Sequence, residues 1–232
     1  MREKRGEMQV LYLDGYKGIR YNIASHQDDF SIYDTKSDPG ESQNLAGTSG
    51  EFVKLQEEMK NTVLRWRRYN PSAERPYDKE PVPAIEPQNT MAKGIKLSKY
   101  KIKSPWAPYI YTSAQPAKEV AILSHIEAPQ GEDPYNVMVY EGFLMVGNTG
   151  EHEINFRTNG SLVIHIHEAL LVDDDHLEMA KGKGSSKIIL EKGFHPVKIV
   201  YKRGESGPSE LELKWSAQGF QNEDLALYHK DS

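Results

Sequence analysis

The most informative absence in this sequence is cysteine. None of the 232 residues is a cysteine, which excludes disulfides, thiolate metal sites and a cysteine nucleophile. Long apolar runs are missing too, since no stretch approaches the roughly 20 apolar residues of a membrane-spanning helix. The apolar run at residues 8–13 is too short for the core of a signal peptide. We expect no membrane span, and either a cytoplasmic protein or a chain that begins after its export signal.

A dense patch of positive charge is also absent. The 29 Lys and Arg residues are outnumbered by 34 Asp and Glu residues, the formal net charge is −5, and acids and bases are interspersed. Nucleic acids and anionic membranes are bound by clustered basic residues, so we expect neither as a partner. The acidic balance is compatible with Mg²⁺ or Ca²⁺ but does not imply either ion.

The first 70 residues predict a small antiparallel sheet followed by one helix. Three short runs within residues 8–33 are typical of strands, and Asp14-Gly15 is typical of a hairpin turn. Apolar residues at three- and four-residue steps then predict a helix, which Thr48 and Glu51 would begin as a capping box. The apolar stripe consists of Phe52, Leu55, Met59, Val63 and Trp66.

Proline-rich residues 71–94 predict an extended, semi-rigid linker between a domain of residues 1–70 and one of residues 95–232. Beyond the linker the apolar period switches to two, which favours an antiparallel β-sandwich or barrel. The candidate strands are residues 99–102, 120–123, 136–141, 151–156, 162–167, 187–190, 197–201 and 211–215. Small residues 182–186 predict a mobile loop.

The segment after the third predicted strand resembles the C-terminal signature of type I sulfatases. Here Ile32-Tyr33-Asp34 is followed by Asp38-Pro39-Gly40-Glu41 and Asn44-Leu45, and the resemblance covers residues 8–68. It implies a small α+β subdomain in which these residues have structural duties. Lys17 is then either an exposed strand lysine or a group that approaches an acidic substrate in a complete enzyme.

The catalytic parts of a sulfatase are absent from this chain. The family requires Cys or Ser in a Cys/Ser-x-Pro-x-Arg motif and a set of Asp and Asn ligands for a divalent cation, and the sequence contains no such motif. Sulfuryl transfer needs both the nucleophile and the cation. We therefore expect no catalytic residue and no enzyme activity on this chain, and the missing sulfatase catalytic domain as its partner.

The second domain resembles PA14 modules, which are β-sandwiches or barrels of secreted proteins. The resemblance is carried by residues 140–146, 150–156, 193–201 and 211–215. In lectin-type members two adjacent acidic residues before a glycine hold Ca²⁺, which binds sugar hydroxyls. Thr158-Asn159-Gly160 occupies that place here, so Ca²⁺ is a weak expectation, although Asn159 and His167 stay ligand-binding candidates.

Three further groups of residues are candidates for binding. Asp173-Asp174-Asp175 has three interpretations. It is either a cation site formed by Asp173 and Asp175, an acidic loop that hydrogen-bonds sugar hydroxyls, or a solvated turn at the end of a strand. His165 and His167 alternate along a strand and could begin a Zn²⁺ site or simply be exposed, whereas His195 is interpreted as structural. Trp106 and Tyr109 are either a stacking platform for sugar rings or a wedge that holds the linker.

These observations predict a mainly β chain that is the non-catalytic C-terminal part of a sulfatase. Its PA14-like module would bind glycans, such as a sulfated polysaccharide, and would target a parent enzyme that hydrolyses sulfate esters. The alternative is a structural or assembly domain without a ligand. The family resemblance implies a periplasmic or extracellular location.

Overall fold

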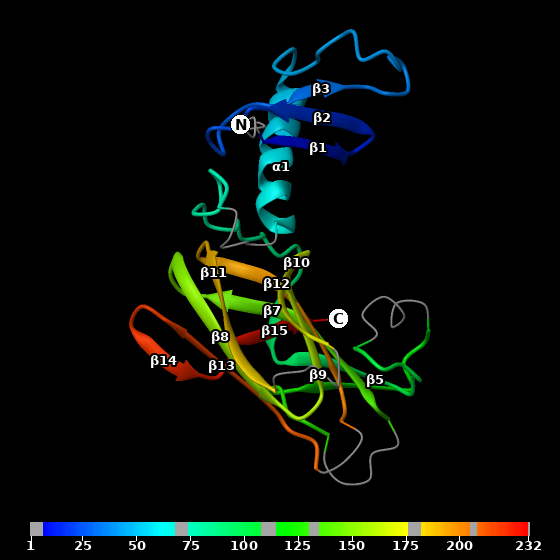
Figure 1. The fold of residues 1–232 in the computed structure, drawn as a ribbon, viewed down its shortest axis with the longest axis vertical. Helices are drawn as coiled ribbons and strands as arrows, with labels where there is room; N and C mark the ends of the chain where they lie inside the picture. Colours follow the sequence, from blue (N-terminus) through cyan, green and yellow to red (C-terminus); the bar gives the residue numbers. More distant parts are fainter. Residues whose placement is uncertain are drawn as a thin grey trace, which may run out of the picture. The chain divides into compact units, whose positions relative to one another are not determined.

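The computed structural model describes residues 7–67, 74–107, 115–129, 135–175, 182–204 and 208–231. The chain divides into two compact units, Met1–Arg65 with Tyr69–Glu80, and Trp66–Arg68 with Pro81–Ser232. Antiparallel strands and one helix form the regular structure of the described residues (Figure 1). The prediction of a mainly β chain is confirmed. No described helix has the length and hydrophobicity that crossing a membrane requires.

The first unit contains a three-stranded antiparallel sheet. Its strands β1 (Met8–Leu13), β2 (Tyr16–Tyr21) and β3 (Ser31–Tyr33) lie side by side in chain order. Asp14 and Gly15 join β1 to β2 with positive φ angles of 51° and 86°. Such angles suit glycine and the short side chain of aspartate, so the predicted hairpin turn is confirmed.

Helix α1 (Gly50–Trp66) begins one residue later than the predicted capping box requires. The Ser49 hydroxyl oxygen accepts the N–H of Phe52 at 3.5 Å, so Ser49 is the capping residue. Thr48 instead donates its hydroxyl to the carbonyl of Leu45 at 2.7 Å. The apolar stripe also ends early, because Trp66 is 60% exposed.

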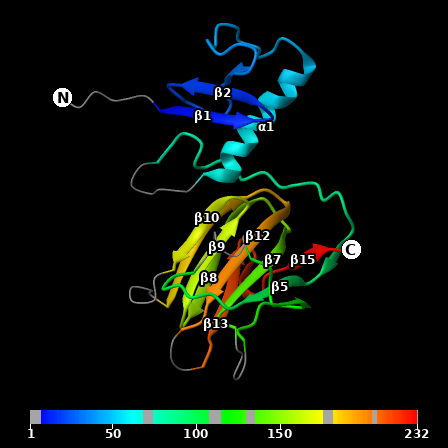
Figure 2. The ribbon, with the colours of Figure 1, turned by 90° about the vertical axis from the view of Figure 1, so that its right-hand side faces the viewer.

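One face of the sheet packs on α1 through a small core of Phe30, Ile32, Leu55 and Met59 (Figures 1 and 2). A Cβ at Gly18 would lie 2.6 Å from the Met59 sulfur, so the glycine allows the helix to approach the sheet. Gln56 is buried on the same side of α1. Its amide accepts the N–H of Phe30 and donates to the carbonyl of Phe30, both at 3.0 Å. These paired bonds fix the helix to the start of β3.

The sulfatase-like signature is held by local hydrogen bonds. The N–H of Gln43 donates to the Asp38 carboxylate at 2.8 Å and lowers the pKa of Asp38. Asn44 Oδ1 accepts the N–H of Ile32 at 2.9 Å, which ties the segment to β3. Lys17 forms an ion pair with Glu41 at 2.6 Å. The described contacts of these side chains are structural.

The second unit is built from two antiparallel sheets (Figures 1 and 2). The eight-stranded sheet has the order β10-β9-β12-β7-β15-β4, and β5 joins β7 and carries β6. The four-stranded sheet has the order β11-β8-β13-β14. The described strands form two separate sheets rather than one closed barrel. Their bounds are β4 Met91–Lys93, β5 Ile95–Tyr100, β6 Glu119–Leu123, β7 Val137–Val146, β8 Gly150–Thr158, β9 Ser161–Ile166, β10 Ala169–Asp174, β11 Lys183–Leu190, β12 Gly193–Lys202, β13 Leu211–Ala217, β14 Phe220–Glu223 and β15 Leu227–Lys230.

The predicted strands of this unit coincide with observed ones, with displaced ends in several cases. The strand expected at residues 99–102 is β5, which begins at Ile95 and ends at Tyr100. The sequence patterns missed β4, β10, β14 and β15. The loop predicted at residues 182–186 is wrong, because Lys183 to Ser186 pair with β8 as the start of β11.

The core of the second unit lies between the two sheets. Buried residues of both sheets meet there, including Tyr140, Leu144, Ile154, Ile199 and Trp215. A second apolar cluster joins Tyr100, Ile102 and Ala107 to four valines of β7, β9 and β12. Residues 81–94, which were expected to be a linker, also contribute. Val82 is 1% exposed and bridges to Leu190, Ile85 bridges to Phe194, and β4 pairs with β15.

Candidate functional site

Asn159 has a structural role in the turn between β8 and β9. Its Oδ1 accepts the hydroxyl of Tyr201 at 3.1 Å and the N–H of Glu210 at 2.9 Å. Its Nδ2 donates to the carbonyl of Pro208. Both the oxygen and the nitrogen of the amide therefore form hydrogen bonds within the protein. This ligand-binding candidate links the β8–β9 turn to β12 and to the segment before β13.

The acidic triplet is not a solvated turn, because Asp173 and Asp174 are the last residues of β10. Successive side chains of a strand point to opposite faces, so the two carboxylates diverge. Asp173 is exposed, whereas Asp174 is 8% exposed and accepts the N–H of Gly182 at 3.1 Å. Asp175 accepts the N–H of Ala107 through its backbone carbonyl at 3.3 Å. Within the described ranges, no group of three or more His, Asp or Glu could hold a metal ion.

His167 pairs with His195 rather than with His165. His167 occupies the two-residue turn between β9 and β10 with a φ of 52°, and its Nε2 lies 2.9 Å from Nδ1 of His195. Nε2 of His195 lies 2.7 Å from the carbonyl of Glu191 and must donate there, so His195 Nδ1 is the acceptor. Burial lowers the pKa of His165, and the neighbouring Lys198 lowers it further.

Trp106 lies on the segment that follows β5. Its side chain is 44% exposed, and its backbone N–H donates to the Ser104 hydroxyl at 3.3 Å. The bond between Ala107 and Asp175 brings this segment beside the end of β10. The structure thus places two predicted features, the exposed tryptophan and the acidic residues, on neighbouring segments. Tyr109, the other predicted aromatic, lies outside the described residues.

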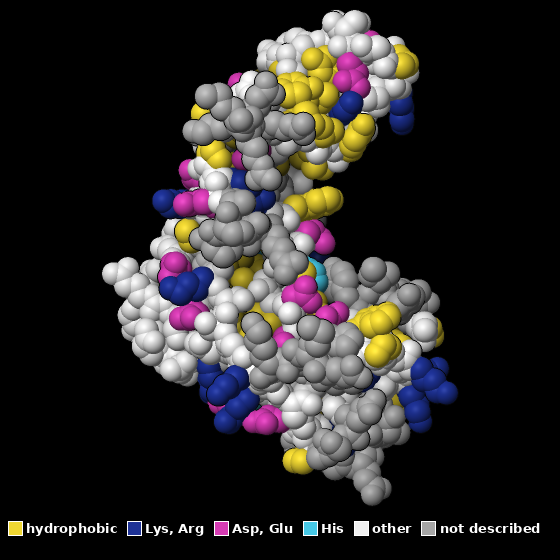
Figure 3. Space-filling view, viewed as in Figure 1, with side chains coloured by type: hydrophobic (Ala, Val, Ile, Leu, Met, Phe, Trp, Pro, Cys, Tyr) yellow, Lys and Arg dark blue, Asp and Glu magenta, His cyan; other side chains and the backbone are white. Residues whose placement is uncertain are grey.

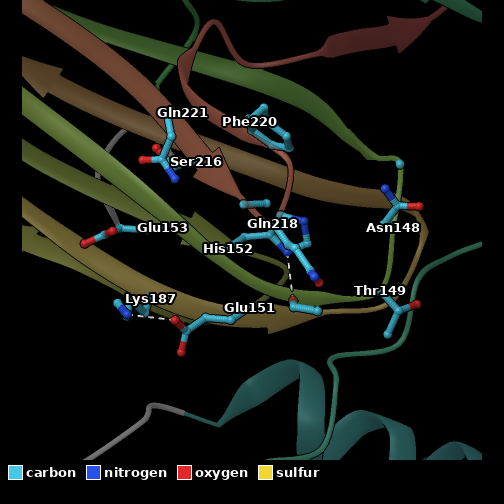
Figure 4. A pocket seen from close by; sticks show the side chains of 13 residues that line it. Asn148, Thr149, Glu151, His152, Glu153, Lys187, Ser216, Gln218, Phe220 and Gln221 are labelled. Carbon is cyan, nitrogen blue, oxygen red and sulfur yellow. Dashed lines mark hydrogen bonds and ion pairs between the residues drawn. The ribbon is translucent and has the colours of Figure 1, made fainter.

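The structure also shows a cleft that the sequence patterns did not indicate (Figure 4). It has a volume of about 540 Å³ and lies where the connection from β7 to β8 meets the β13–β14 hairpin. We call it the amide cleft. The side chains that define it are Asn148, Thr149, Glu151, His152, Glu153, Lys187, Ser216, Gln218, Phe220 and Gln221.

His152 gives the amide cleft a fixed polar group. The ring is 2% exposed, stacks on Trp215 at 4.6 Å, and donates from Nδ1 to the carbonyl of Gly150 at 2.8 Å. Burial lowers the pKa of His152. The neutral ring therefore carries its proton on Nδ1, which leaves Nε2 as an acceptor. No described residue forms a hydrogen bond with Nε2.

The other lining groups offer both donors and acceptors. Figure 4 shows Asn148 and Thr149 on the β7–β8 connection and Gln218 and Gln221 on the β13–β14 hairpin. Glu151 forms an ion pair with Lys187 at 2.7 Å, so this charge is matched within the cleft. Amide side chains each present a donor and an acceptor, as a sugar hydroxyl does. The arrangement suits a neutral polar ligand with many hydroxyls.

Two further clefts lie on the sheets. One, of about 690 Å³, is lined by Arg157, Glu212 and Lys214 of the four-stranded sheet, among others. Three of its charged side chains form ion pairs, since Arg157 contacts Glu210 and Glu212 and Lys214 contacts Asp224. The other, of about 410 Å³, lies on the eight-stranded sheet and includes His167. The amide cleft differs from both in its share of neutral hydrogen-bonding side chains.

The sequence matches no protein-family model, and no curated protein matches it. Among solved structures, an anti-sigma factor domain-containing protein aligns at a TM-score of 0.49 and 18% identity, over 63% of this chain and 50% of that one. This chain thus spans half the length of that protein. The epithelial adhesin 9 A domain from Candida glabrata, in complex with Galb1-3GlcNAc, aligns at 0.47 and 10% identity, over 64% and 94%. The PA14 domain of the MpAFP antifreeze protein aligns at 0.48 and 11% identity, over 62% and 95%. These similarities are too distant to transfer residue roles.

Proposed function

We propose that the second unit is a non-catalytic carbohydrate-binding module and that the amide cleft is its binding site. In this proposal the first unit is the C-terminal subdomain of a sulfatase-type hydrolase, and the module holds the catalytic domain near a glycan. Avidity makes such a module useful even when each contact is weak. The chain itself would carry no catalytic residue.

The composition of the amide cleft is the observation that carries this proposal. Its volume of about 540 Å³ suits a short oligosaccharide. Five neutral amide and hydroxyl side chains line it together with His152, whose Nε2 is an acceptor, and Phe220 supplies an aromatic surface. Sugar rings bind by hydrogen bonds from their hydroxyls and by packing of their C–H groups on aromatic faces.

A binding assay with a matched substitution tests the site. We expect the chain to bind at least one neutral glycan on a glycan array, and Gln218→Ala to weaken that binding about fivefold, the value of one hydrogen bond. Gln88→Ala is the control, because Gln88 is also exposed and lies outside the amide cleft. Affinities would be compared by isothermal titration calorimetry. If the chain binds no neutral and no sulfated glycan on the array, with or without Ca²⁺, the proposal is refuted.

The proposed link to a sulfatase rests on the signature of the first unit. The contacts of Asp38 and Asn44 are structural, which agrees with the duties that the family resemblance implies for them. Sequencing the gene upstream of Met1 tests the link. A Cys/Ser-x-Pro-x-Arg motif in the same reading frame is expected. A stop codon directly upstream, without such a motif, would contradict it.

One observation favours the alternative, a structural role in packing on another domain. The outer face of the first unit's sheet carries exposed apolar side chains, and Figure 3 shows hydrophobic groups on the surface of this unit. They are Met8, Val10, Tyr12 and Tyr21, which are 46–64% exposed. Contiguous apolar surface of this kind marks interaction sites. Replacing Tyr12 and Tyr21 by Ser would then impair association with a catalytic domain without changing glycan binding.

A further inference from the structure

The cleft on the eight-stranded sheet gathers more basic than acidic side chains. We call it the lysine cleft and define it by Lys96 of β5, Glu141 and Phe143 of β7, Lys198 of β12 and Lys230 of β15. Its volume is about 410 Å³. His167, Glu168 and His229 also line it, so three lysines and two histidines face two glutamates. The local charge is positive on a chain whose formal net charge is −5.

Two of the three lysines form no ion pair with any residue that the structure describes. Lys198 forms an ion pair with Glu141 at 3.4 Å. Lys96 stands opposite Glu141 in the β5–β7 ladder, but no described residue forms an ion pair with it. Lys230 lies over the ring of Phe143 at 5.9 Å and likewise has no ion-pair partner among the described residues. These two ammonium groups come from β5 and β15, which pair with successive parts of β7 along the edge that β12 leaves free.

The walls of the lysine cleft are partly apolar. Phe143 of β7 lines the cleft, and the exposed side chain of Ile122 lies beside Lys96 in the β5–β6 ladder. A free inorganic anion has no apolar part that could pack on these groups. An anionic sugar can use both kinds of wall, because its ring packs on the apolar surface while its oxyanion contacts the lysines.

We propose that the lysine cleft is a second glycan-binding site, which takes the sulfate or carboxylate group of an acidic polysaccharide. This inference rests on the proposed carbohydrate-binding function and names the class of glycan. The attraction must be local, since the negative net charge of the chain repels polyanions at long range. Salt screens exposed charges beyond about 8 Å at physiological ionic strength, so binding weakens as salt rises.

The test uses the full chain and two double variants of equal charge. Lys96→Gln/Lys230→Gln removes the two cleft lysines that form no ion pair within the described ranges. Lys101→Gln/Lys103→Gln removes two exposed lysines of the same unit outside the cleft, so both variants lose the same formal charge. Binding of dextran sulfate, polygalacturonate and unsulfated dextran is measured by isothermal titration calorimetry at low and at physiological salt.

The expected result is that Lys96→Gln/Lys230→Gln weakens dextran sulfate binding about fivefold or more and flattens its salt dependence. The Lys101→Gln/Lys103→Gln variant stays within about twofold of the unaltered chain. The response to polygalacturonate shows whether carboxylates are also accepted. Free sulfate at equal charge should compete poorly, because it lacks a ring.

Three outcomes would overturn the inference. Equal weakening by the two variants would show that only net charge matters. If Lys96→Gln/Lys230→Gln keeps its affinity for dextran sulfate while Gln218→Ala still weakens the binding of neutral glycans, the proposed function stands and the lysine cleft has no part in it. Absence of binding to every glycan would defeat the proposed function and this inference together.

Discussion

Replacement of Asn159 by alanine removes three side-chain hydrogen bonds from one turn of the second unit. The amide ties the β8–β9 turn to Tyr201 of β12 and to the segment containing Pro208 and Glu210. A hydrogen bond contributes about 0.5–1.5 kcal/mol net, and water can replace part of it at this exposed side chain. We therefore expect Asn159→Ala to lower the free energy of unfolding by about 1–3 kcal/mol.

Thermal unfolding followed by calorimetry measures this loss. A loss of 1–3 kcal/mol corresponds to a melting temperature about 3–9 °C lower for a unit of this size. Asn148→Ala is the matched control, because Asn148 is exposed and no described residue forms a hydrogen bond with its side chain. Hydrogen exchange at the amide of Glu210 gives a local readout and should accelerate only in Asn159→Ala.

An unchanged stability of Asn159→Ala would contradict the structural role of this side chain. If Asn159→Ala melts within about 1 °C of the unaltered chain and the amide of Glu210 exchanges at its original rate, the turn does not depend on this side chain. Asn159 would then be available as a ligand, as the sequence first suggested. A rise in melting temperature with millimolar Ca²⁺ that Asn159→Ala abolishes would point to the same conclusion.

Three other substitutions or conditions have defined outcomes. Gly160→Ala would place a Cβ 2.1 Å from a backbone carbonyl of β12 and should cost about 3 kcal/mol in urea unfolding, whereas Gly147→Ala, with open space around it, should change stability by less than about 0.5 kcal/mol. Gln56→Leu leaves two backbone groups of the first unit's core unpaired, so calorimetry should show a loss of about 2–4 kcal/mol, and an unchanged unfolding would contradict the assigned bonds. Burial lowers the pKa of both His152 and His165 in the folded chain. The unfolded chain therefore binds protons first as pH falls below about 6.5, and stability should fall by up to about 1.4 kcal/mol per pH unit for each histidine. The urea midpoint between about pH 7.5 and 5.5 checks this, and His152→Gln should make the slope shallower.

The sequence predicted elements best where the signal was local. The hairpin at Asp14-Gly15 requires positive φ angles that these residues tolerate, and the apolar period of α1 appears within one segment. The prediction from local signals was wrong for β11, because its first residues are small and typical of a loop. Pairing with β8 makes them a strand, and Gly184 lies against the ring of Phe156. No pattern within residues 182–186 contains that partner.

The candidate site also depends on contacts that local sequence patterns do not contain. The sequence offered Asn159 and the acidic triplet as candidates, yet the exposed Asn159 is held by hydrogen bonds from two other segments, and β10 sends Asp173 and Asp174 to opposite faces. The amide cleft is assembled from two connections far apart in the chain, around a histidine whose burial depends on Trp215. A glutamine on a hairpin, such as Gln218, carries no signal by itself.

By itself, the sequence determined that this is an antiparallel, mainly β chain whose first unit combines a small sheet with one helix, because turn chemistry and the two apolar periods are properties of neighbouring residues. Only the tertiary structure decided which strands pair, which polar side chains are buried and where the clefts lie. Those outcomes depend on contacts between distant segments, such as the bridge of Val82 to Leu190 and the pairing of β5, with Lys96, and β15, with Lys230, along one edge of β7. The two clefts where we expect glycans to bind are products of that arrangement.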